Sequence, residues 1–483
     1  MFYCVNLNEE FRDYYRLLWN NNKNEMPTIY RFKILTMGTV DSPFLSISTI
    51  HYHLDKTAKE EPELKEACEL IKKHLYVDDL MAAVDSTSEA IKLRKIISAI
   101  FIKMKMKIQK GTSNSSDLLK TIPRDECSPV EEITETKKAP IYSENDITFN
   151  DPEVVSQTTK CLGMTWTPKE DVFHYKTYEN LEEERSKRFT KRGISSLIPS
   201  IYDPTGLLQP FIIQGKLILQ SAWTHKDKNG KSLNWDDALP EEIKEPWIKW
   251  IKDIKEISKF TTNRYLFKNM EEIPTRDKLY LHCFADAGQN AWGISIYIRF
   301  YNSLITKYES HLIYATSRVA PTKTTLSTPK KELNSILLAC QKISYIAEAL
   351  AIQKTNMYIH TDSLVALHWI NQDKNSLKTY VSNRVNKIQQ AEITILHVPG
   401  KENPADLCSK PKPTKTYVNN QFWLHGPQLL EESNETLEEK YKLSNVMQRI
   451  LSVQEDESLR KEMKKEITIA RSNKIQIETE NCD

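Results

Sequence analysis

The sequence predicts a multidomain protein of mixed α/β and α+β class. Its 483 residues suggest about three domains at roughly 150 residues each. Hydrophobic residues make up 40% of the chain, which is enough to build packed cores. Strand and helix patterns alternate over residues 278–412, whereas residues 206–260 have mostly helical patterns. Together, these observations predict sheet-containing domains connected by a helical region.

The composition excludes several classes of protein. Lysine and arginine number 67 against 65 aspartate and glutamate, so a net charge of +2 neither requires nor excludes nucleic acid. No two of the eight cysteines lie within four positions, which argues against a zinc half-site and favours buried thiols in a reducing compartment. Acidic and basic residues within the first twenty positions argue against a secretory signal, and no stretch of about 18 apolar residues predicts a membrane span. We therefore expect an intracellular protein without a membrane partner.

The first region, residues 1–108, is expected to mix short strands with helices. The expected elements are a strand at 30–35, a helix opening at Ser42-Pro43, a helix at 62–73, and two short strands around the Asp78-Asp79 turn. Ser86-Thr87-Ser88-Glu89 has the form of a capping box and predicts the start of another helix. Lys103, Lys105 and Lys107 alternate with apolar residues, which predicts a strand with one basic face.

The composition changes twice in the middle of the chain, near residues 109 and 159. Residues 109–158 are polar and rich in proline, so we expect a surface excursion, and residues 159–275 are expected to form a mostly helical connecting region. The densest basic run includes Arg188 and Arg192. Because clustered positive charge suits phosphate groups, we expect this run and the lysines 103 and 105 to contact nucleic acid.

Residues 276–412 give the clearest prediction, a mixed sheet with helices. The expected strands are 279–285, 292–300, 311–317, 356–360 and 392–398, and the expected helices are one beginning at Pro329, two at 363–370 and 377–391, and a last one after Asn403-Pro404. The remaining residues, 413–483, are expected to form a charged tail with a helix near 441–452.

Four acids occupy the ends of these elements. Asp286 and Asp362 end two strands, and Glu332 and Asp406 lie in the first turns of two helices. Strand ends and helix starts are where sheet folds gather functional groups, so we expect the four carboxylates to converge. Two unit charges 4 Å apart repel by about 4 kcal/mol at an effective dielectric constant of 20, so such a cluster requires cations. Oxygen ligands suit Mg²⁺ or Mn²⁺, and two such ions can hydrolyse a phosphodiester.

This segment resembles a retroelement ribonuclease H domain. The likeness rests on the order of the elements and on Phe284-Ala285-Asp286-Ala287, Glu332-Leu333, Thr361-Asp362-Ser363 and Asn403-Pro404-Ala405-Asp406. The resemblance implies that the four acids hold two Mg²⁺ ions and cleave the RNA strand of an RNA–DNA hybrid. Many such enzymes carry a histidine in the loop before the last acid, where this chain has Lys401. We expect Lys401 to contact nucleic acid instead, with altered turnover.

Residues 76–79 resemble the palm motif of a reverse transcriptase. Met37-Gly38-Thr39-Val40-Asp41-Ser42-Pro43 is similar to the segment that lies against template and nucleotide, and Leu162-Gly163-Met164-Thr165-Trp166 to the primer-contacting hairpin. The resemblance implies that Asp78 and Asp79 bind metal and that Gly38 lies near a DNA or RNA template-primer. In the family a third acid lies just before a Met-Phe pair, which here is Met1-Phe2. We therefore expect a truncated palm that does not polymerise DNA efficiently.

Three further sequence motifs resemble those of the BEL/Pao class of LTR retrotransposon polyproteins. The motifs are Thr190-Lys191-Arg192-Gly193-Ile194, the run from Ile201-Tyr202-Asp203-Pro204 to Pro210, and Trp423-Leu424-His425-Gly426-Pro427. The resemblance implies a Pol fragment located in the cytoplasm, a virus-like particle or the nucleus. One alternative is a catalytically dead remnant that only binds nucleic acid. A weaker one is an aspartic peptidase, for which Asp286-Ala287-Gly288 is the nearest string.

Overall fold

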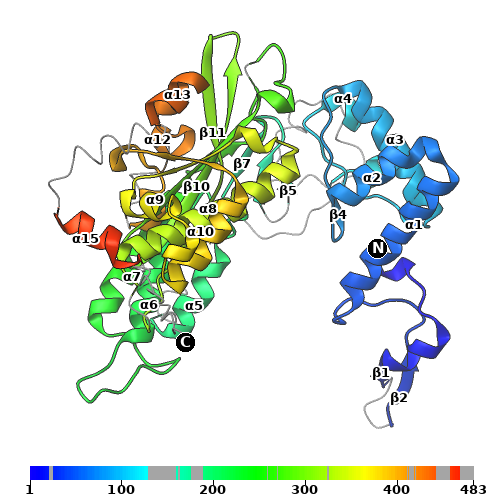
Figure 1. The fold of residues 1–483 in the computed structure, drawn as a ribbon. Helices are drawn as coiled ribbons and strands as arrows, with labels where there is room; N and C mark the ends of the chain where they lie inside the picture. Colours follow the sequence, from blue (N-terminus) through cyan, green and yellow to red (C-terminus); the bar gives the residue numbers. More distant parts are fainter. Residues whose placement is uncertain are drawn as a thin grey trace, which may run out of the picture. The chain divides into compact units, whose positions relative to one another are not determined.

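The computed structural model describes two compact units, Met1–Val172 and Phe173–Asp483 (Figure 1). The described residues are 1–20, 26–128, 159–161, 164–175, 189–410 without 258, 269, 324 and 325, and then 412, 418, 420–441 and 457–467. Each unit has its own hydrophobic core. Among these residues, no helix combines the length and the apolar character needed to cross a membrane. The finer division expected near residues 108, 158, 275 and 412 stays a prediction.

The first unit combines small antiparallel strand pairs with a helical core. Its elements are β1 (Arg16–Trp19), β2 (Thr28–Arg31), α1 (Ser42–Glu60), α2 (Lys65–His74), β3 (Leu75–Tyr76), β4 (Asp79–Leu80), α3 (Thr87–Lys103), α4 (Ser116–Lys120), β5 (Thr159–Cys161) and β6 (Met164–Thr167). Apolar residues of α1, α2 and α3 form the core. The Ser86 hydroxyl accepts a hydrogen bond from the Glu89 N–H, as the capping box predicts. The strand expected at 30–35 lies earlier and ends at Arg31.

The basic strand expected over residues 103–107 was wrong. Helix α3 continues to Lys103 and ends in a reversal at Lys105, whose φ is 56°. The Met106 N–H bonds the Phe101 carbonyl and the Lys105 N–H bonds the Ile102 carbonyl, the pattern of a Schellman cap. Met106 is 6% exposed and packs in the same core as Phe101. Burial of this one methionine folds the chain back and overrides the alternating pattern.

The second unit is built around a five-stranded mixed sheet of order β11-β10-β9-β12-β13. Its strands are β9 (Tyr280–Ala287), β10 (Ala291–Asn302), β11 (Lys307–Val319), β12 (Met357–Thr361) and β13 (Thr394–His397). The first three run antiparallel as a meander, whereas β12 is parallel to both β9 and β13. The parallel arrangement brings the carboxyl ends of β9 and β12 to the same edge of the sheet.

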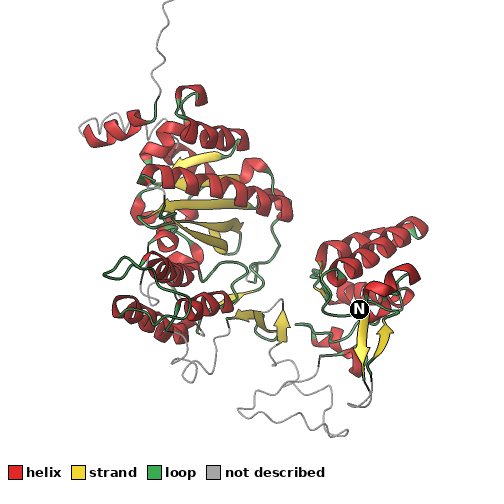
Figure 2. Cartoon of the chain, turned by 90° about the horizontal axis from the view of Figure 1, so that it is seen from below, coloured by secondary structure: helices red, strands yellow, loops and turns green. Residues whose placement is uncertain are grey.

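Helices pack on the sheet from both sides, as Figure 2 shows. The helices of this unit are α5 (Lys191–Ser200), α6 (Gln209–Thr224), α7 (Glu241–Ile257), α8 (Thr328–Leu350), α9 (Leu364–Ile370), α10 (Thr379–Ala391), α11 (Asp406–Ser409), α12 (Gln421–His425), α13 (Asn434–Tyr441) and α15 (Glu457–Lys465). Helices α5 and α7 pack on α6, and α15 packs on α9. Two further strands are β7 (Val172–His174) and β8 (Thr261–Asn263). The main core lies between the sheet and α8, α9 and α10. The element order expected for residues 276–412 is therefore the observed one.

The loop before α6 pairs with the edge strand β11. The Ala315 N–H donates to the Thr205 carbonyl at 2.9 Å, and the Ser317 N–H donates to the Gln209 side-chain oxygen at 3.2 Å. Gly206 has a φ of +80°, and a Cβ there would lie 1.7 Å from the Ala315 carbonyl oxygen. Only glycine permits this approach of the two backbones. The motif at residues 201–210 thus has a structural role, because it attaches the helical region to the sheet.

The C-terminal residues that the structure describes are not a solvated tail. The Trp423 indole is fully buried and donates to the Leu207 carbonyl at 3.0 Å. Arg299 of β10, also fully buried, donates to the Leu430 carbonyl at 2.7 Å. Met463 of α15 joins the main core. The helix expected at 441–452 falls mostly on residues outside the described ones, and α13 ends at Tyr441.

Candidate functional site

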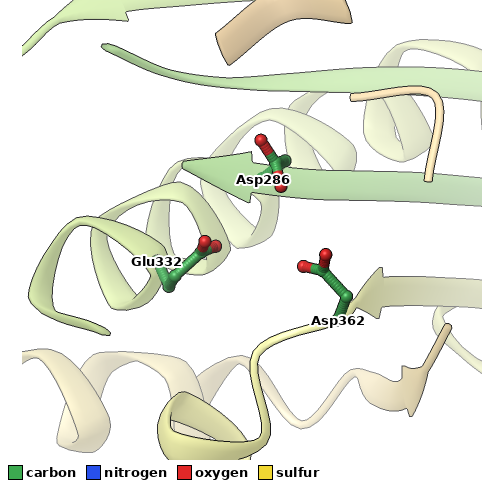
Figure 3. A group of neighbouring side chains, drawn as sticks. All are labelled: Asp286, Glu332 and Asp362. Atoms are coloured by element: carbon green, nitrogen blue, oxygen red, sulfur yellow. The ribbon is translucent and has the colours of Figure 1, made fainter. Parts of the chain in front are cut away.

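Three of the predicted acids come together at one edge of the sheet. Asp286 lies near the end of β9, Asp362 follows β12, and Glu332 lies in the first turns of α8. Each offers a carboxylate oxygen, and these oxygens all lie within 4.8 Å of one another. Figure 3 shows the three side chains pointing toward a common centre. Because β9 and β12 are parallel neighbours and α8 packs on both, the fold itself brings these acids together.

The environment of this acid triad opposes negative charge. Asp286 is 1% exposed and Glu332 is 7% exposed. Burial raises the pKa of Asp286 to about 6, and burial together with the neighbouring Asp286 and Asp362 carboxylates raises the pKa of Glu332 well above its usual value. Burial also raises the pKa of Asp362. The triad therefore needs either protons or cations to be stable.

One carboxylate oxygen of the triad has no hydrogen-bond partner. Glu332 Oε2 is buried and unpaired, while the Ala287 N–H supports the same carboxylate. A buried polar atom without a partner costs about 1–3 kcal/mol, so it indicates a missing ligand. A hard cation among three carboxylates would satisfy it. The donor set and the orphaned oxygen both fit a divalent metal ion.

The fourth predicted acid, Asp406, lies outside the group of three. Its carboxylate pairs with Lys410 one helical turn later and with Lys412 Nζ at 3.2 Å. Lys410 Nζ also lies 3.6 Å from Asp286 Oδ2, so this ammonium group bridges two of the four acids. Burial works against the charge of Lys410, but Asp406, Asp286 and Asp362 raise its pKa above the usual value. Lys410 was not among the predicted site residues, although its i, i+4 spacing from Asp406 offered a signal.

Two loop residues complete the surroundings of the triad. Gly400 lies so close to Asp362 that a Cβ there would be 2.8 Å from Asp362 Oδ2. Asn403 donates from Nδ2 to the Ala285 carbonyl at 3.0 Å, and its Oδ1 accepts from the Ala405 N–H at 3.1 Å. The loop before α11 is thereby fixed beside the end of β9. Lys401 follows Gly400 and is exposed, so it lies next to the site without entering the triad.

The second predicted metal site, in the first unit, has a different character. Asp78 and Asp79 belong to a hairpin of two-residue strands, in which Tyr76 pairs with Asp79, and both acids are exposed. Val77 has a φ of 53°, an unfavourable value for a β-branched residue. Within the part of the chain that the structure describes, the triad at residue 286 is the one group of three potential metal ligands.

The residues predicted to contact nucleic acid differ in whether they already pair with an acid of the chain. Lys103 pairs with Glu61, and Arg192 forms two hydrogen bonds with Asp236 at 2.7 and 2.8 Å. Gly38, with a φ of 92°, lies in a turn before α1, and a Cβ added there would meet no atom within 4 Å. Lys105 is exposed. Arg188 lies outside the described residues.

Residues 190–363 match a family model described as the Pao retrotransposon-like RNaseH-like domain. The matched residues run from Thr190 and include Asp286, Glu332 and Asp362. The expected resemblance to a Pao-type retrotransposon polyprotein is confirmed for this part of the chain. The description names a ribonuclease H-like domain, which gives the peptidase hypothesis no support. No curated protein sequence matches the chain.

Several solved structures resemble parts of the chain. An RNase H1 from the halophilic archaeon Halobacterium salinarum NRC-1 is 10% identical, covering 26% of this chain and 89% of its own, with a TM-score of 0.18. LC11-RNase H1, isolated from compost, is 13% identical over 29% of this chain and 98% of its own, with a TM-score of 0.21. A foamy viral protease-reverse transcriptase in complex with dsDNA is 14% identical over 82% of this chain and 66% of its own, with a TM-score of 0.19.

Proposed function

We propose that residues 276–412, within a retrotransposon Pol fragment, form a metal-dependent ribonuclease H that cleaves RNA in RNA–DNA hybrids. One observation carries the proposal, the convergence of Asp286, Glu332 and Asp362 within 4.8 Å around an unpaired buried oxygen. The match of the surrounding residues to a retrotransposon ribonuclease H-like family supports it. Nucleic acid is then the partner, and Mg²⁺ or Mn²⁺ the cofactor.

The residues of the triad would hold the metal, and Asp406 would join them. Bound divalent ions would activate a water molecule and stabilise the leaving oxygen of the phosphodiester. The three acids are held on rigid elements, a strand end, a helix start and the residue after a strand, which keeps their oxygens in fixed positions. Asn403 fixes the loop that carries Asp406, and Gly400 leaves room beside Asp362.

A cleavage assay with a matched variant tests the proposal. The full chain is incubated with an RNA–DNA hybrid labelled on the RNA strand, with Mg²⁺ or with a chelator, and compared with Asp362→Asn. We expect cleavage that requires the metal and is lost in the variant. Cleavage that persists in both the chelator and the variant would contradict the proposal, because it would arise outside the acid triad.

Binding of the hybrid without any cleavage would favour the alternative, a remnant that only binds nucleic acid. Two observations motivate that alternative, the pairing of Asp406 with two lysines and the presence of Lys401 in place of a histidine. We further propose that the chain alone does not polymerise DNA efficiently. Asp78 and Asp79 lack a third potential ligand among the described residues, whereas the chemistry at a primer terminus requires a fuller set of carboxylates.

A further inference from the structure

A short C-terminal segment, residues 457–467, packs across the starts of two helices near the acid triad. Its helix α15 lies beside α9 in Figure 1. Met463 is 7% exposed, and its carbonyl accepts a hydrogen bond from the fully buried Trp369 indole at 3.0 Å. This segment, which we call the strap, is therefore docked on the sheet domain through the apolar side chains of Met463 and Ile467 and through several polar contacts.

The backbone of the strap occupies the start of α10. The Lys378 N–H donates to the Glu466 carbonyl at 2.9 Å, and Lys378 Nζ donates to the Lys465 carbonyl at 2.6 Å. Leu377 and Ile467 form an antiparallel bridge. Helix α10 has no side-chain cap of its own at Lys378. The strap thus supplies oxygen atoms to a helix start, where negative charge is favourable.

The carboxylate of Glu466 occupies a second cationic position. Glu466 is 5% exposed, and its Oε1 lies 2.9 Å from Lys330 Nζ. Lys330 also lies over the Tyr380 ring, on which the Arg384 guanidinium stacks at 3.5 Å. The strap therefore covers Lys330 and Lys378, and it pairs with them through one carboxylate and two carbonyl oxygens. Arg384 borders this surface on the Tyr380 ring and bonds Asn334 Oδ1 and the Tyr380 carbonyl.

This cationic surface adjoins the proposed catalytic acids. Lys330 and Glu332 both lie in the first turns of α8, which begins at Thr328. Residues two apart on a helix point to different sides, so a chain of phosphates in contact with Lys330 would have to cross the start of α8, within one turn of about 5.4 Å, to reach the triad. Phosphate oxygens are good acceptors for lysine and arginine and for the N–H groups at a helix start. The oxygens of the strap thus stand where phosphate oxygens could bind.

We propose that Lys330, Lys378 and Arg384 form a binding surface for the sugar–phosphate backbone, and that the strap covers it as an intramolecular competitor. The nature of the partner rests on the proposed function. The Lys330–Glu466 pair joins a buried carboxylate to an ammonium group whose side chain is 24% exposed. Such a pair gains little net free energy because its charges give up water to form it. Exchange of the strap carboxylate for a phosphate is therefore inexpensive, and a nucleic acid that binds here displaces the strap.

A pair of charge-neutralising variants tests this competition. Both are made in the Asp362→Asn chain, so that an RNA–DNA hybrid stays intact during the measurement. Glu466→Gln removes the contact with Lys330, whereas the control Glu462→Gln removes the same charge from the same strap, where Glu462 lies on α15 and pairs with Lys465. By fluorescence anisotropy at low salt, we expect Glu466→Gln to tighten hybrid binding by about 3- to 10-fold and the control to change it by less than about 2-fold.

Hydrogen exchange gives a second readout that does not depend on cleavage. Saturating hybrid is expected to lower the protection of the Lys378 amide and of residues 463–467 in the Asp362→Asn chain. Unchanged or increased protection, or equal hybrid affinity in the two glutamine variants, would overturn the inference and make the strap a permanent part of the core. If the Asp362→Asn chain shows this competition but the unsubstituted chain does not cleave the hybrid, the competition stands and the proposed function is refuted.

Discussion

The acid triad and the Asp78-Asp79 hairpin are both acidic motifs beside a sheet, but they differ in burial and in the number of acids that converge. The triad joins residues from β9, α8 and the end of β12, and two of its members are almost fully buried. The hairpin pair belongs to one tight turn, is exposed, and has no third potential ligand nearby among the described residues. The difference teaches that in this chain the convergence of three acids depends on separate elements packed together, which the hairpin alone does not supply.

The largest expected effect separates the two regions by activity. We expect Asp286→Asn to lower hybrid cleavage by about 10²–10³-fold, the usual cost of losing a group that supports charge in the transition state. Asp79→Asn is expected to leave cleavage unchanged, because this residue belongs to the other compact unit. Initial rates with labelled hybrid measure both. Equal losses in the two variants would show that the two regions work as one site.

A second expected effect concerns pH in the absence of divalent ions. The folded Asp286 carboxyl binds its proton more tightly than the unfolded one, with a pKa of about 6 against 3.8. Protonation therefore stabilises the folded chain, and stability is lost as the pH rises from about 4 to above 6, by roughly 2–3 kcal/mol. Urea unfolding at both pH values with chelator should show this loss relative to Asp286→Asn. A matched Asp79→Asn variant should retain the wild-type dependence.

Divalent ions should reverse that loss through the triad alone. At ten times the dissociation constant, Mg²⁺ or Mn²⁺ is expected to raise the free energy of unfolding by about 1.4 kcal/mol. Glu332→Gln should abolish the effect, since it neutralises one of the three converging carboxylates. Thermal unfolding with and without the ion measures it. If Asp78→Asn abolished the effect and Glu332→Gln did not, the hairpin would be the metal site.

A smaller effect is expected from Lys410, which bridges Asp286 and Asp406. Its ammonium group repels an incoming cation, so Lys410→Met should tighten divalent-ion binding by about 3- to 10-fold. Lys412→Met is the matched control, because Lys412 contacts Asp406 but not Asp286. Calorimetric titration distinguishes them. Weaker binding in Lys410→Met would mean that Lys410 holds Asp406 in place for the metal.

The smallest effect is expected in the hairpin itself. Val77 adopts a left-handed φ of 53°, which costs a β-branched residue about 1–2 kcal/mol and glycine almost nothing. Because glycine also loses more entropy on folding, Val77→Gly should stabilise the first unit by less than about 1 kcal/mol. Chemical denaturation measures this, with hybrid cleavage unchanged. Clear destabilisation would show that packing of the half-buried Val77 side chain contributes more to stability than its backbone strain costs.

The sequence predicted the elements of residues 276–412 because each has a local signature. Met357–Thr361 is a short apolar run, and Pro329 marks the start of a helix with apolar residues at helical spacing. The acids could be placed at element ends by the same signals. The alternation at Lys103–Lys107 predicted a strand that does not form. Burial of Met106 at the end of α3 determines the local conformation instead of the alternating pattern.

Such local signatures could not predict contacts between residues that are distant in the sequence. Trp423 and Met463 lie in polar segments with no apolar period, and their burial depends on partners far away in the chain, Leu207 and Trp369. The bridge from Lys410 to Asp286 depends on the same kind of tertiary contact. Periodicity reports which side of an element is apolar, but it does not report what a single side chain meets across the fold.

The pairing of residues 205–209 with β11 has a practical consequence for anyone who shortens this protein. An expression clone that starts at residue 276 would leave the Ala315 and Ser317 amides without their acceptors on Thr205 and Gln209. Exposed strands of this kind recruit strands from other molecules. We expect such a truncated chain to precipitate or form mixed oligomers, and a soluble product would have to begin upstream of the Gly206 turn.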